Sequence, residues 1–302
     1  MPGPAAFIAV DWGTTNSRFW LCDAAGAVLD ERHGQGVAPL RGTERFGSVF
    51  DELTGGWPEA LPAVLCGTIG ANIGWRQVGY RECPAPLSDG ARGALQFDHG
   101  SRRISILAGV TARNMIGEPD LMRGEETQLA GVCAKGTGDG LFVLPGTHNK
   151  WVRVEGGAIT AFHTSMSGEL YGAIAGHTIL LVPGAGQPGP GGMFDHGVRQ
   201  ALANSAASFA TLLFSVRTRQ VMGEMGEADA ASCLSGLVIG ADVAGARHWL
   251  ADAGDVAIIG GSALAASYAR ALELAGGTSR SIAGDSAVLT GLTLAWRQLT
   301  GV

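Results

Sequence analysis

Short apolar runs separated by polar, glycine-rich turns make up the first third of the chain. Runs of this kind predict β-strands, whereas apolar residues three to four positions apart predict a helix. Strands are predicted over residues 7–10, 19–23, 28–31, 63–66 and 104–108, and a helix over residues 46–53. The chain is therefore expected to begin as a meander of short strands and to continue as mixed α/β structure.

A similar order of elements begins again near residue 120. A helix is predicted after residue 121, followed by strands over 141–144, 151–154 and 159–163, with a polar turn and a glycine turn between them. The two halves share this layout but no repeat at the level of residues. We therefore expect two domains, an N-terminal one over 1–119 and a C-terminal one over 120–302.

The remainder of the second domain is mainly helical by its pattern. Residues 256–259 predict a buried strand that stops at two glycines and leads into a helix over 263–274. The last predicted helix, over 286–298, has one apolar face. This position suits packing back onto the first domain, so residues from about 285 to 302 could belong with it in space.

Composition restricts the class of function. The 302 residues are 46% hydrophobic and 16% charged, and no apolar run reaches the roughly 18 residues of a membrane span. A net charge of −6 disfavours binding to a nucleic-acid backbone. The five cysteines include no C-x-x-C pair, and the N-terminal residues lack an export signal. We expect a cytoplasmic protein with reduced thiols and with neither a nucleic-acid nor a membrane partner.

The first candidate motif is the turn after the first predicted strand. Asp11 stands at the strand end, and Gly13, Thr14, Thr15 and Asn16 follow in a tight corner. Backbone N–H groups and hydroxyls in such a corner can bind phosphate oxygens, and the carboxylate can hold Mg²⁺ through water. An ordinary polar hairpin with a capping Asp explains the same residues equally well.

A second corner lies between the strands predicted over 141–144 and 151–154. It contains Gly146, Thr147, His148 and Lys150. Backbone donors together with a lysine could hold the phosphates of a nucleotide or the carboxylate of a sugar acid. A solvated hairpin is the alternative, but the two corners together are stronger evidence than either alone.

Two further segments suggest chemistry. Glu125 and Glu126 open a predicted helix, where one of them could accept the proton of a hydroxyl that is being phosphorylated; favourable interaction with the helix dipole, or a cap, explains them as well. Gly260, Gly261 and Ser262 follow a buried strand, where adenosine or phosphate can lie against bare backbone. Close packing between strand and helix is the alternative for these glycines.

Other patterns are set aside. The segment 184–189 matches G-x-G-x-x-G, but Pro188 and Pro190 prevent the helix that a dinucleotide site requires. His99 and His196 lack partners at metal-ligand spacing and are predicted to be turn residues. The sequence also contains no Walker-type ATP loop.

Taken together, the segments 11–18, 145–150 and 258–262 resemble the two phosphate motifs and the adenosine motif of the sugar kinase/Hsp70/actin superfamily. This resemblance implies an α/β, two-domain actin-like ATPase (ribonuclease H-like) fold with an ATP cleft between the domains. More closely, the segments 67–75, 123–128, 144–152 and 164–170 are similar to the 2-dehydro-3-deoxygalactonokinase family, and the similarity covers nearly the whole chain.

The resemblance implies a kinase that uses ATP and Mg²⁺ to phosphorylate the terminal (6-) hydroxyl of 2-dehydro-3-deoxy-D-galactonate in galactose or galactonate catabolism. Asp11 would organise Mg²⁺, and the residues Gly13 to Asn16 with Gly146 and Thr147 would hold phosphates. Related sugar kinases carry a Gly-Asp pair before the second phosphate turn, and Gly124-Glu125 stands in that place here. Glu125 is therefore the expected base and Glu126 the alternative.

Substrate contacts are expected from two places. Arg18, His148 and Lys150 are the candidate ligands of the substrate carboxylate. Gly70, Asn72 and Trp75 belong to the glycine loop that would contact the sugar, where Ala71-Asn72 replaces the Ser beside a polar residue expected in the family. A kinase for a related keto-deoxy sugar acid or sugar therefore stays an alternative.

A non-kinase ATP-binding protein like Hsp70 or actin is a further alternative, in which hydrolysis would drive the exchange of partners. A sugar-sensing repressor would need a helix-turn-helix extension, and the first predicted strand begins almost at residue 1. The expected partner is a small sugar acid, and a homo-oligomer is possible.

Overall fold

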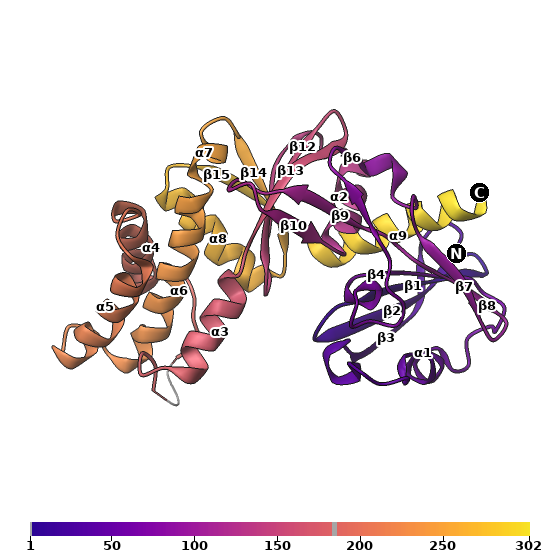
Figure 1. Cartoon of the computed structure of the whole chain (residues 1–302), viewed down its shortest axis with the longest axis horizontal. Coiled ribbons are helices and arrows are strands. Elements are labelled where there is room, and N and C mark those ends of the chain that lie inside the picture. The colour runs from indigo at the N-terminus through magenta and orange to yellow at the C-terminus, as the bar shows by residue number, and fades with distance from the viewer. Residues whose placement is uncertain (1, 183–185) are drawn as a thin grey trace. The chain divides into compact units, whose positions relative to one another are not determined.

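The computed structural model describes residues 2–182 and 186–302, except for the side chain of Ser262. The first residues of the 184–189 motif lie outside this description. The chain forms two compact units, coloured by residue number in Figure 1. Unit 1 contains Met1–Asp139, Val154–Phe162 and Gly284–Val302, and unit 2 contains Gly140–Arg153 and His163–Ala283.

A six-stranded sheet forms the centre of unit 1. Its strands lie in the order β3 (Val28–Gln35), β2 (Asn16–Asp23), β1 (Ala5–Trp12), β4 (Ala63–Cys66), β8 (Arg102–Ile106) and β7 (Leu95–His99). Strand β1 runs antiparallel to β2, with Asp11 opposite Arg18, and parallel to β4, with Asp11 opposite Cys66. The register therefore brings three residues that are distant in sequence to one end of the sheet.

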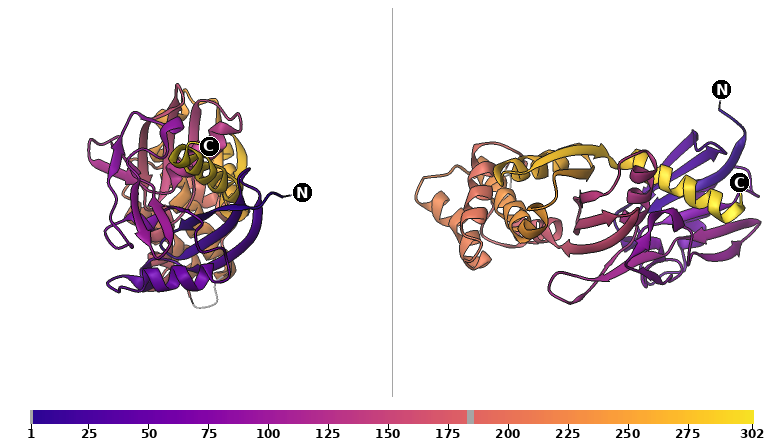
Figure 2. Two further views of the ribbon diagram at one scale, coloured as in Figure 1. Left: turned by 90° about the vertical axis from the view of Figure 1, so that its right-hand side faces the viewer. Right: turned by 90° about the horizontal axis from the view of Figure 1, so that it is seen from above.

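The two faces of this sheet follow the period-two alternation of β1. Val10 and other residues of one face pack with α1 (Phe46–Thr54). Phe7 on the other face stacks on Trp296 of α9 (Gly284–Thr300), with ring centroids 4.5 Å apart. Figure 2 shows α9 beside this sheet and both chain termini in unit 1. The last helix therefore packs back onto the N-terminal unit.

Helix α2 (Glu125–Ala134) packs on α9 at unusually close range because two glycines face the opposite backbone. A β-carbon on Gly131 would lie 1.9 Å from the carbonyl oxygen of Ala287, and one on Gly291 would lie 2.0 Å from that of Thr127. No other residue fits at either position without a shift of backbone. This contact fixes the start of α2 relative to the sheet.

Shorter elements complete unit 1. They are a three-stranded sheet in the order β10 (Pro119–Met122), β9 (Gly109–Arg113) and β5 (Tyr80–Glu82), the strand β6 (Ala85–Pro86), and the 3₁₀ turns η1 (Ala38–Leu40), η2 (Thr68–Gly70) and η3 (Leu87–Asp89).

The described residues of unit 2 form part of a second sheet and six helices. The six strands of this sheet lie in the order β15 (Thr278–Ala283), β14 (Asp255–Gly260), β11 (Gly140–Leu144), β12 (Asn149–Glu155), β13 (Ala158–Ser165) and β6, and β14 is parallel to both β11 and β15. Strand β6 and the segment Val154–Phe162 of the β12–β13 hairpin belong to unit 1. The helices are α3 (Ser167–His177), α4 (Gly192–Ala203), α5 (Phe209–Val221), α6 (Glu227–Gly245), α7 (Arg247–Leu250) and α8 (Ser262–Leu274).

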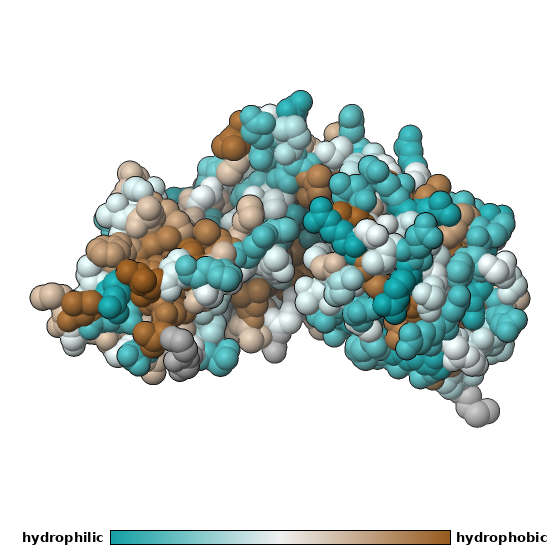
Figure 3. Space-filling model, turned by 60° about the horizontal axis from the view of Figure 1, so that its bottom comes forward, coloured by the Kyte–Doolittle hydropathy of each residue, from teal (hydrophilic) through white to brown (hydrophobic). Residues whose placement is uncertain are grey.

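Helix α6 is central to the helical part of unit 2, in contact with α3, α4, α5 and α8. It has the length and apolarity of a membrane span, but 67% of its apolar stretch is buried in the structure, as expected for a core helix. By contrast, α5 buries only Val216 and leaves Phe214 exposed. Apolar side chains accordingly reach the surface over this helical part, on the left of Figure 3.

Most predicted elements agree with the structure to within a few residues, including β1, β4, β14 and both long C-terminal helices. The short or polar strands β5, β6, β7, β9, β10 and β15 were not predicted. The expectation that His99 and His196 are turn residues is wrong, because His99 is the last residue of β7 and His196 lies within α4. The boundary at residue 120 stays a prediction; the chain passes from unit 1 to unit 2 after Asp139.

Candidate active site

The structure divides the predicted site residues into one group in each unit. In unit 1, the turn between β1 and β2 is closed by the Gly13 N–H, which donates to the Asn16 carbonyl at 3.0 Å. The N–H groups of Gly36 and Ala38 donate to the carbonyls of Thr15 and Thr14. Bonds on both sides hold the turn in one conformation, and the side chains of Thr14, Thr15 and Asn16 are exposed. The turn can therefore present hydroxyls to a ligand.

Asp11 lies at the end of β1 with its side chain 19% exposed. Nη2 of Arg18 donates to its Oδ2 at 2.7 Å, and Nη1 of Arg18 bonds the carboxylate of Asp285 at the start of α9. The other oxygen, Oδ1, lies 3.9 Å from the Cys66 thiol. Arg18 is thus held between two carboxylates, and Oδ1 of Asp11 is the oxygen with a weak partner.

The glycine loop after β4 lies directly beside this turn. Gly67 has a φ of +93°, and a β-carbon there would lie 2.7 Å from the Trp12 carbonyl oxygen. This close approach requires glycine. It brings the next hydroxyl, that of Thr68, within 3.0 Å of the Thr14 hydroxyl. Thr68, which the sequence did not single out, is therefore part of the same polar surface.

The three loop residues predicted to contact the sugar have different surroundings. Asn72 is exposed. Gly70 is buried, and a β-carbon there would lie 2.7 Å from Nη1 of Arg123. Trp75 packs its ring against those of Phe50 and Phe97, at centroid distances of 5.6 and 5.2 Å. Of the three, Asn72 is the residue whose side chain is most open to a ligand.

Glu125 and Glu126 open α2, as predicted, and both accept backbone N–H groups from the preceding turn. Glu125 is partly exposed, and its Oε2 accepts the N–H of Arg123 at 3.0 Å. Glu126 is 4% exposed; both its oxygens accept the Gly124 N–H, and Oε1 also accepts the Thr127 hydroxyl. Burial, and then the charge of Glu125, raises the pKa of Glu126 to about 7.

The start of α2 touches the glycine loop. A β-carbon on Gly124, whose φ is +110°, would lie 3.3 Å from the Cα of Gly67. Cys66 is fully buried, and its thiol pKa lies well above the usual value because of that burial and the charges of Asp11 and Glu126. The carboxylates of Asp11 and Glu126 are therefore both close enough to the Cys66 thiol to raise its pKa. Unit 1 brings together the first turn, the glycine loop and the glutamate pair.

In unit 2, the second predicted turn rests against the start of α3. A β-carbon on Gly168 would lie 2.3 Å from the Gly146 carbonyl oxygen and 2.9 Å from the Cα of Thr147. The Glu169 N–H donates to the Thr147 carbonyl at 2.9 Å. The missing side chain of Gly168 lets α3 support the turn directly, and the side chain of Thr147 is exposed.

The two cationic candidates near this turn differ in burial. His148 is half exposed, and its Nε2 pairs with the Glu169 carboxylate. Lys150 is 5% exposed, and its Nζ donates to the Thr164 hydroxyl at 2.9 Å. Within the described parts of the chain, no carboxylate lies within ion-pair distance of Lys150. A buried ammonium without a counter-ion is costly, and an anionic ligand would relieve that cost.

The adenosine candidates lie next to the second turn. Strands β11 and β14 are parallel neighbours, with Val143 opposite Ile258, so the residues after both strands meet at one edge of the sheet. A β-carbon on Gly260 would lie 3.6 Å from Cδ of Pro145, and Gly261 has open space beside it. Gly261 precedes α8, which begins at Ser262. The helix N-terminus therefore opens beside the Gly146 turn.

Two acidic residues near these turns were missed by sequence reasoning. Asp285 pairs with Arg18 across 267 residues of chain. Asp242, buried in α6, accepts bonds from Asn149 and Trp151 immediately after the second turn. A signal existed for Asp242, because it interrupts the apolar C-terminal half of α6. Nothing local distinguishes Asp285 from a surface acid.

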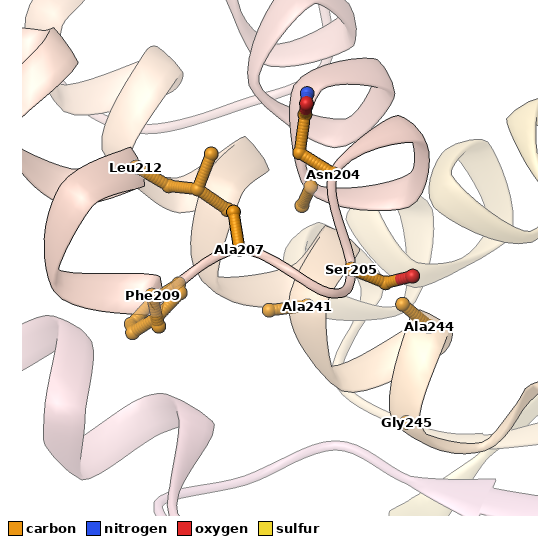
Figure 4. A pocket seen from close by; sticks show the side chains of 9 residues that line it. Asn204, Ser205, Ala207, Phe209, Leu212, Ala241, Ala244 and Gly245 are labelled. Atoms are coloured by element: carbon orange, nitrogen blue, oxygen red, sulfur yellow. The ribbon is translucent and has the colours of Figure 1, made fainter.

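A cavity in the helical part of unit 2 is distinct from these turns. It has a volume of about 190 Å³ and lies between the end of α4, the start of α5 and α6, lined by small and apolar residues such as Ala201, Leu212 and Ala241 (Figure 4). It has no charged lining residue. Its lining offers no acid or base for catalysis.

Comparisons with known proteins identify the family of this chain. The sequence model described as 2-keto-3-deoxy-galactonokinase matches residues 11–295. A protein of Rhizobium meliloti that bears the name 2-dehydro-3-deoxygalactonokinase is 38% identical, over 97% of this chain and 97% of its own length. A 2-dehydro-3-deoxygalactonokinase of Escherichia coli is 34% identical, over 95% of this chain and 96% of its own.

Comparison with solved structures identifies the fold. A crystal structure from Sinorhizobium meliloti, described as that of a 2-dehydro-3-deoxygalactonokinase protein, has a TM-score of 0.89 and 38% identity, and the match covers 98% of this chain and 97% of that one. Component A of the Acidaminococcus fermentans (R)-2-hydroxyglutaryl-CoA dehydratase has a TM-score of 0.53 at 11% identity over 98% of this chain and 100% of its own, which is evidence on the fold alone.

The expected α/β, actin-like ATPase class is therefore confirmed. The motifs at 11–18, 123–128 and 144–152 all lie within the matched range 11–295. The chain belongs to the 2-keto-3-deoxy-galactonokinase family.

Proposed function

We propose that this protein is a 2-dehydro-3-deoxygalactonokinase, which transfers the γ-phosphoryl group of ATP to the terminal (6-) hydroxyl of 2-dehydro-3-deoxy-D-galactonate. The observation that carries the proposal is the family match over 285 of the 302 residues, from 11 to 295. It includes both glycine-threonine turns and the glutamate pair. The enzyme would act in galactose or galactonate catabolism in the cytoplasm.

The nucleotide is assigned to the residues that offer backbone and hydroxyl donors. Gly13 to Asn16 and Gly146 with Thr147 bind the phosphates of ATP, and Gly260, Gly261 and Ser262 lie against the adenosine. Exposure of the Thr14, Thr15 and Thr147 side chains supports this assignment. So does the parallel pairing of β11 with β14, which places Gly260 beside Pro145.

Mg²⁺ is assigned to Asp11. Mg²⁺ in kinases is usually held by one or two carboxylates, with phosphate oxygens and water completing its octahedron. Asp11 fits that pattern, because Arg18 occupies Oδ2 while Oδ1 has only a thiol at 3.9 Å. No cluster of three acidic, His or Cys ligands occurs in the described residues, consistent with a metal held largely by the nucleotide. When bound, the ion would neutralise charge on the transferred phosphoryl group.

Glu125 is assigned as the base that accepts the proton of the 6-hydroxyl. Of the two glutamates, it is the more exposed, and its Oε1 accepts no hydrogen bond from the described part of the chain. Both oxygens of Glu126 are held by the Gly124 N–H, and its side chain is buried. Glu126 is the alternative, because a carboxylate with a pKa of about 7 is well suited to proton transfer near neutral pH.

The substrate carboxylate is assigned first to Lys150, because this buried cation has no acidic partner among the described residues. Arg18 and His148 remain candidates, although each is paired with a carboxylate in the structure. Gly70, Asn72 and Trp75 are assigned to the sugar. Asn72 has the most exposed side chain of the three.

An assay that couples ADP release to NADH oxidation, run over a panel of sugar acids, tests the proposal. The galacto isomer of the 2-dehydro-3-deoxy acid should be the best substrate, with the gluco isomer and simple aldoses slower. Glu125→Gln should lower kcat by about 100-fold or more while ATP still binds. Faster turnover of another acid would reassign the substrate, and ADP release without any acid would favour an Hsp70-like or actin-like ATPase. A loss confined to Glu126→Gln would move the base to Glu126.

A further inference from the structure

A buried hydrogen-bond network surrounds Asp242 in unit 2. Asp242 is 7% exposed, and its Oδ2 accepts the Asn149 side-chain amide at 2.8 Å and the Tyr268 hydroxyl at 2.5 Å. Its Oδ1 accepts Nε1 of Trp151 at 2.9 Å. The Tyr268 hydroxyl also lies 2.9 Å from the hydroxyl of Ser167. Four segments, from α6, β12, α8 and α3, therefore meet at one carboxylate.

The network has no cation. No arginine, lysine or histidine in the described residues lies within ion-pair distance of Asp242, and burial raises its pKa in spite of the bonds from Tyr268, Trp151, Ser167 and Asn149. Apolar residues of similar volume often stabilise a core as well as a buried charge does. A contribution to stability is thus a weak explanation for an aspartate at position 242. A set of four directed hydrogen bonds does, however, fix the positions of the segments that it joins.

The residues that Asp242 holds are those on both sides of the Gly146–Thr147 turn. Asn149 and Trp151 follow the turn, and Lys150 between them points to the opposite face of the strand, toward Thr164. Ser167 precedes Gly168, the residue whose missing side chain admits the Gly146 carbonyl. One carboxylate therefore fixes the strand that leaves the turn and the helix that supports it.

We propose that Asp242 is a positioning residue for the nucleotide, one that fixes the Gly146–Thr147 turn so that its N–H and hydroxyl donors face the phosphates before ATP arrives. This inference rests on the proposed function for the assignment of ATP to that turn. A turn that must be ordered at the moment of binding reduces affinity, so preorganisation should appear in ATP affinity rather than in the proton-transfer step.

Asp242→Asn is the primary test. The amide has nearly the same volume, but its NH₂ group must face either the Trp151 N–H or the donors of Asn149 and Tyr268, so at least one bond is lost. We expect the dissociation constant and KM for ATP to rise about tenfold or more. The KM for the sugar acid should change less than about twofold, and kcat at saturating ATP should stay near the wild-type value.

Asp195→Asn is the matched control. Asp195 is also a buried carboxylate of unit 2, at 8% exposure, but its partner is Arg270, with Nε 3.0 Å from Oδ1, and it does not touch the turn. Its loss should lower the melting temperature and leave the ATP dissociation constant unchanged. Tyr268→Phe keeps the bonds from Asn149 and Trp151 and removes the link to Ser167. It should weaken ATP binding by less than Asp242→Asn does, and it provides a test if Asp242→Asn does not fold.

Calorimetric titration with ATP, without the sugar acid, separates this inference from the proposed function. If the wild type phosphorylates the acid but Asp242→Asn and Tyr268→Phe bind ATP normally, the inference is wrong and the function stands. If both variants bind ATP more weakly but no acid is phosphorylated, the function is wrong and the inference stands. A melting-temperature loss equal to that of Asp195→Asn, with normal ATP affinity, would also overturn the inference. A wild type that binds no ATP would overturn both.

Discussion

Burial changes the protonation of Glu126 at the scale of a single residue. Burial and the charge of Glu125 raise its pKa from 4.5 in an ordinary glutamate to about 7. Between these values the folded chain holds a proton that the unfolded chain has lost. This side chain therefore favours the folded state fully below about pH 4.5, and that contribution is lost as the pH rises through 7.

Glu126→Gln should therefore gain stability relative to the wild type as the pH increases. The difference in the free energy of unfolding, variant minus wild type, should grow by on the order of 3 kcal/mol between pH 4.5 and pH 8. Urea unfolding at a series of pH values measures it. In a Glu125→Gln background the midpoint of this change should move to lower pH, because a neighbouring negative charge is removed. If the difference in the free energy of unfolding between Glu126→Gln and the wild type does not change with pH, burial does not raise the pKa of Glu126.

Replacement of Lys150 should have opposite consequences for the stability of the protein and for its affinity for the sugar acid. The chain has only one other lysine, Lys135, which is exposed. Lys150→Met keeps the length of the side chain and removes a buried cation that lacks an acidic partner in the described structure. The melting temperature should stay level or rise. The KM for the sugar acid should rise about tenfold or more, since a charge-assisted bond is lost.

Lys135→Met is the control for that pair of measurements, and it should change neither the melting temperature nor the KM appreciably. If Lys150→Met leaves the KM for the sugar acid unchanged but raises the KM for ATP, the lysine binds the nucleotide instead. If neither KM moves, Lys150 contacts no ligand.

Glycine decides the packing of two helices at the scale of elements. Gly131 of α2 and Gly172 of α3 are both helical, but a β-carbon on Gly131 would meet the Ala287 carbonyl oxygen at 1.9 Å, whereas one on Gly172 would meet nothing within 4 Å. Gly131→Ala should lower the free energy of unfolding by about 1–3 kcal/mol because the closely packed backbones of α2 and α9 leave no space for the added methyl group. Gly172→Ala should raise it by up to about 1 kcal/mol.

Chemical denaturation of both variants measures this contrast. Equal changes for Gly131→Ala and Gly172→Ala would mean that α2 and α9 do not approach as closely as the structure has them. Because α2 begins with Glu125, Gly131→Ala should also lower kcat, but by a smaller factor than Glu125→Gln does.

Whether a strand could be predicted from the sequence depends on how continuously apolar that strand is. Apolar runs bounded by glycine identified β1, β4 and β14, because burial on both faces leaves a continuous apolar signal. Strand β15 is polar and largely exposed, and β5 has three residues, so neither has a pattern that differs from a loop. The two glycine-threonine turns were predicted because their residues are contiguous. Asp242 was not, because its partner Asn149 is 93 positions away.

The whole molecule depends on contacts between distant parts of the sequence. Helix α9 belongs to unit 1 although it follows all of unit 2, and its Asp285 bonds Arg18 of β2. The sequence suggested this return only through the apolar face of the last helix. The tip of the hairpin over Val154–Phe162 also belongs to unit 1, where Ile159 pairs with Ala85, and no sequence pattern indicated that.

Product analysis is the most direct test of the central claim that this protein is a sugar-acid kinase. The chain would be incubated with ATP, Mg²⁺ and 2-dehydro-3-deoxy-D-galactonate, and the products would be followed by phosphorus and carbon NMR. We expect a phosphate monoester on the terminal (6-) carbon, formed in equimolar amount with ADP. Inorganic phosphate in place of the ester, or an ester at another hydroxyl, would contradict the claim.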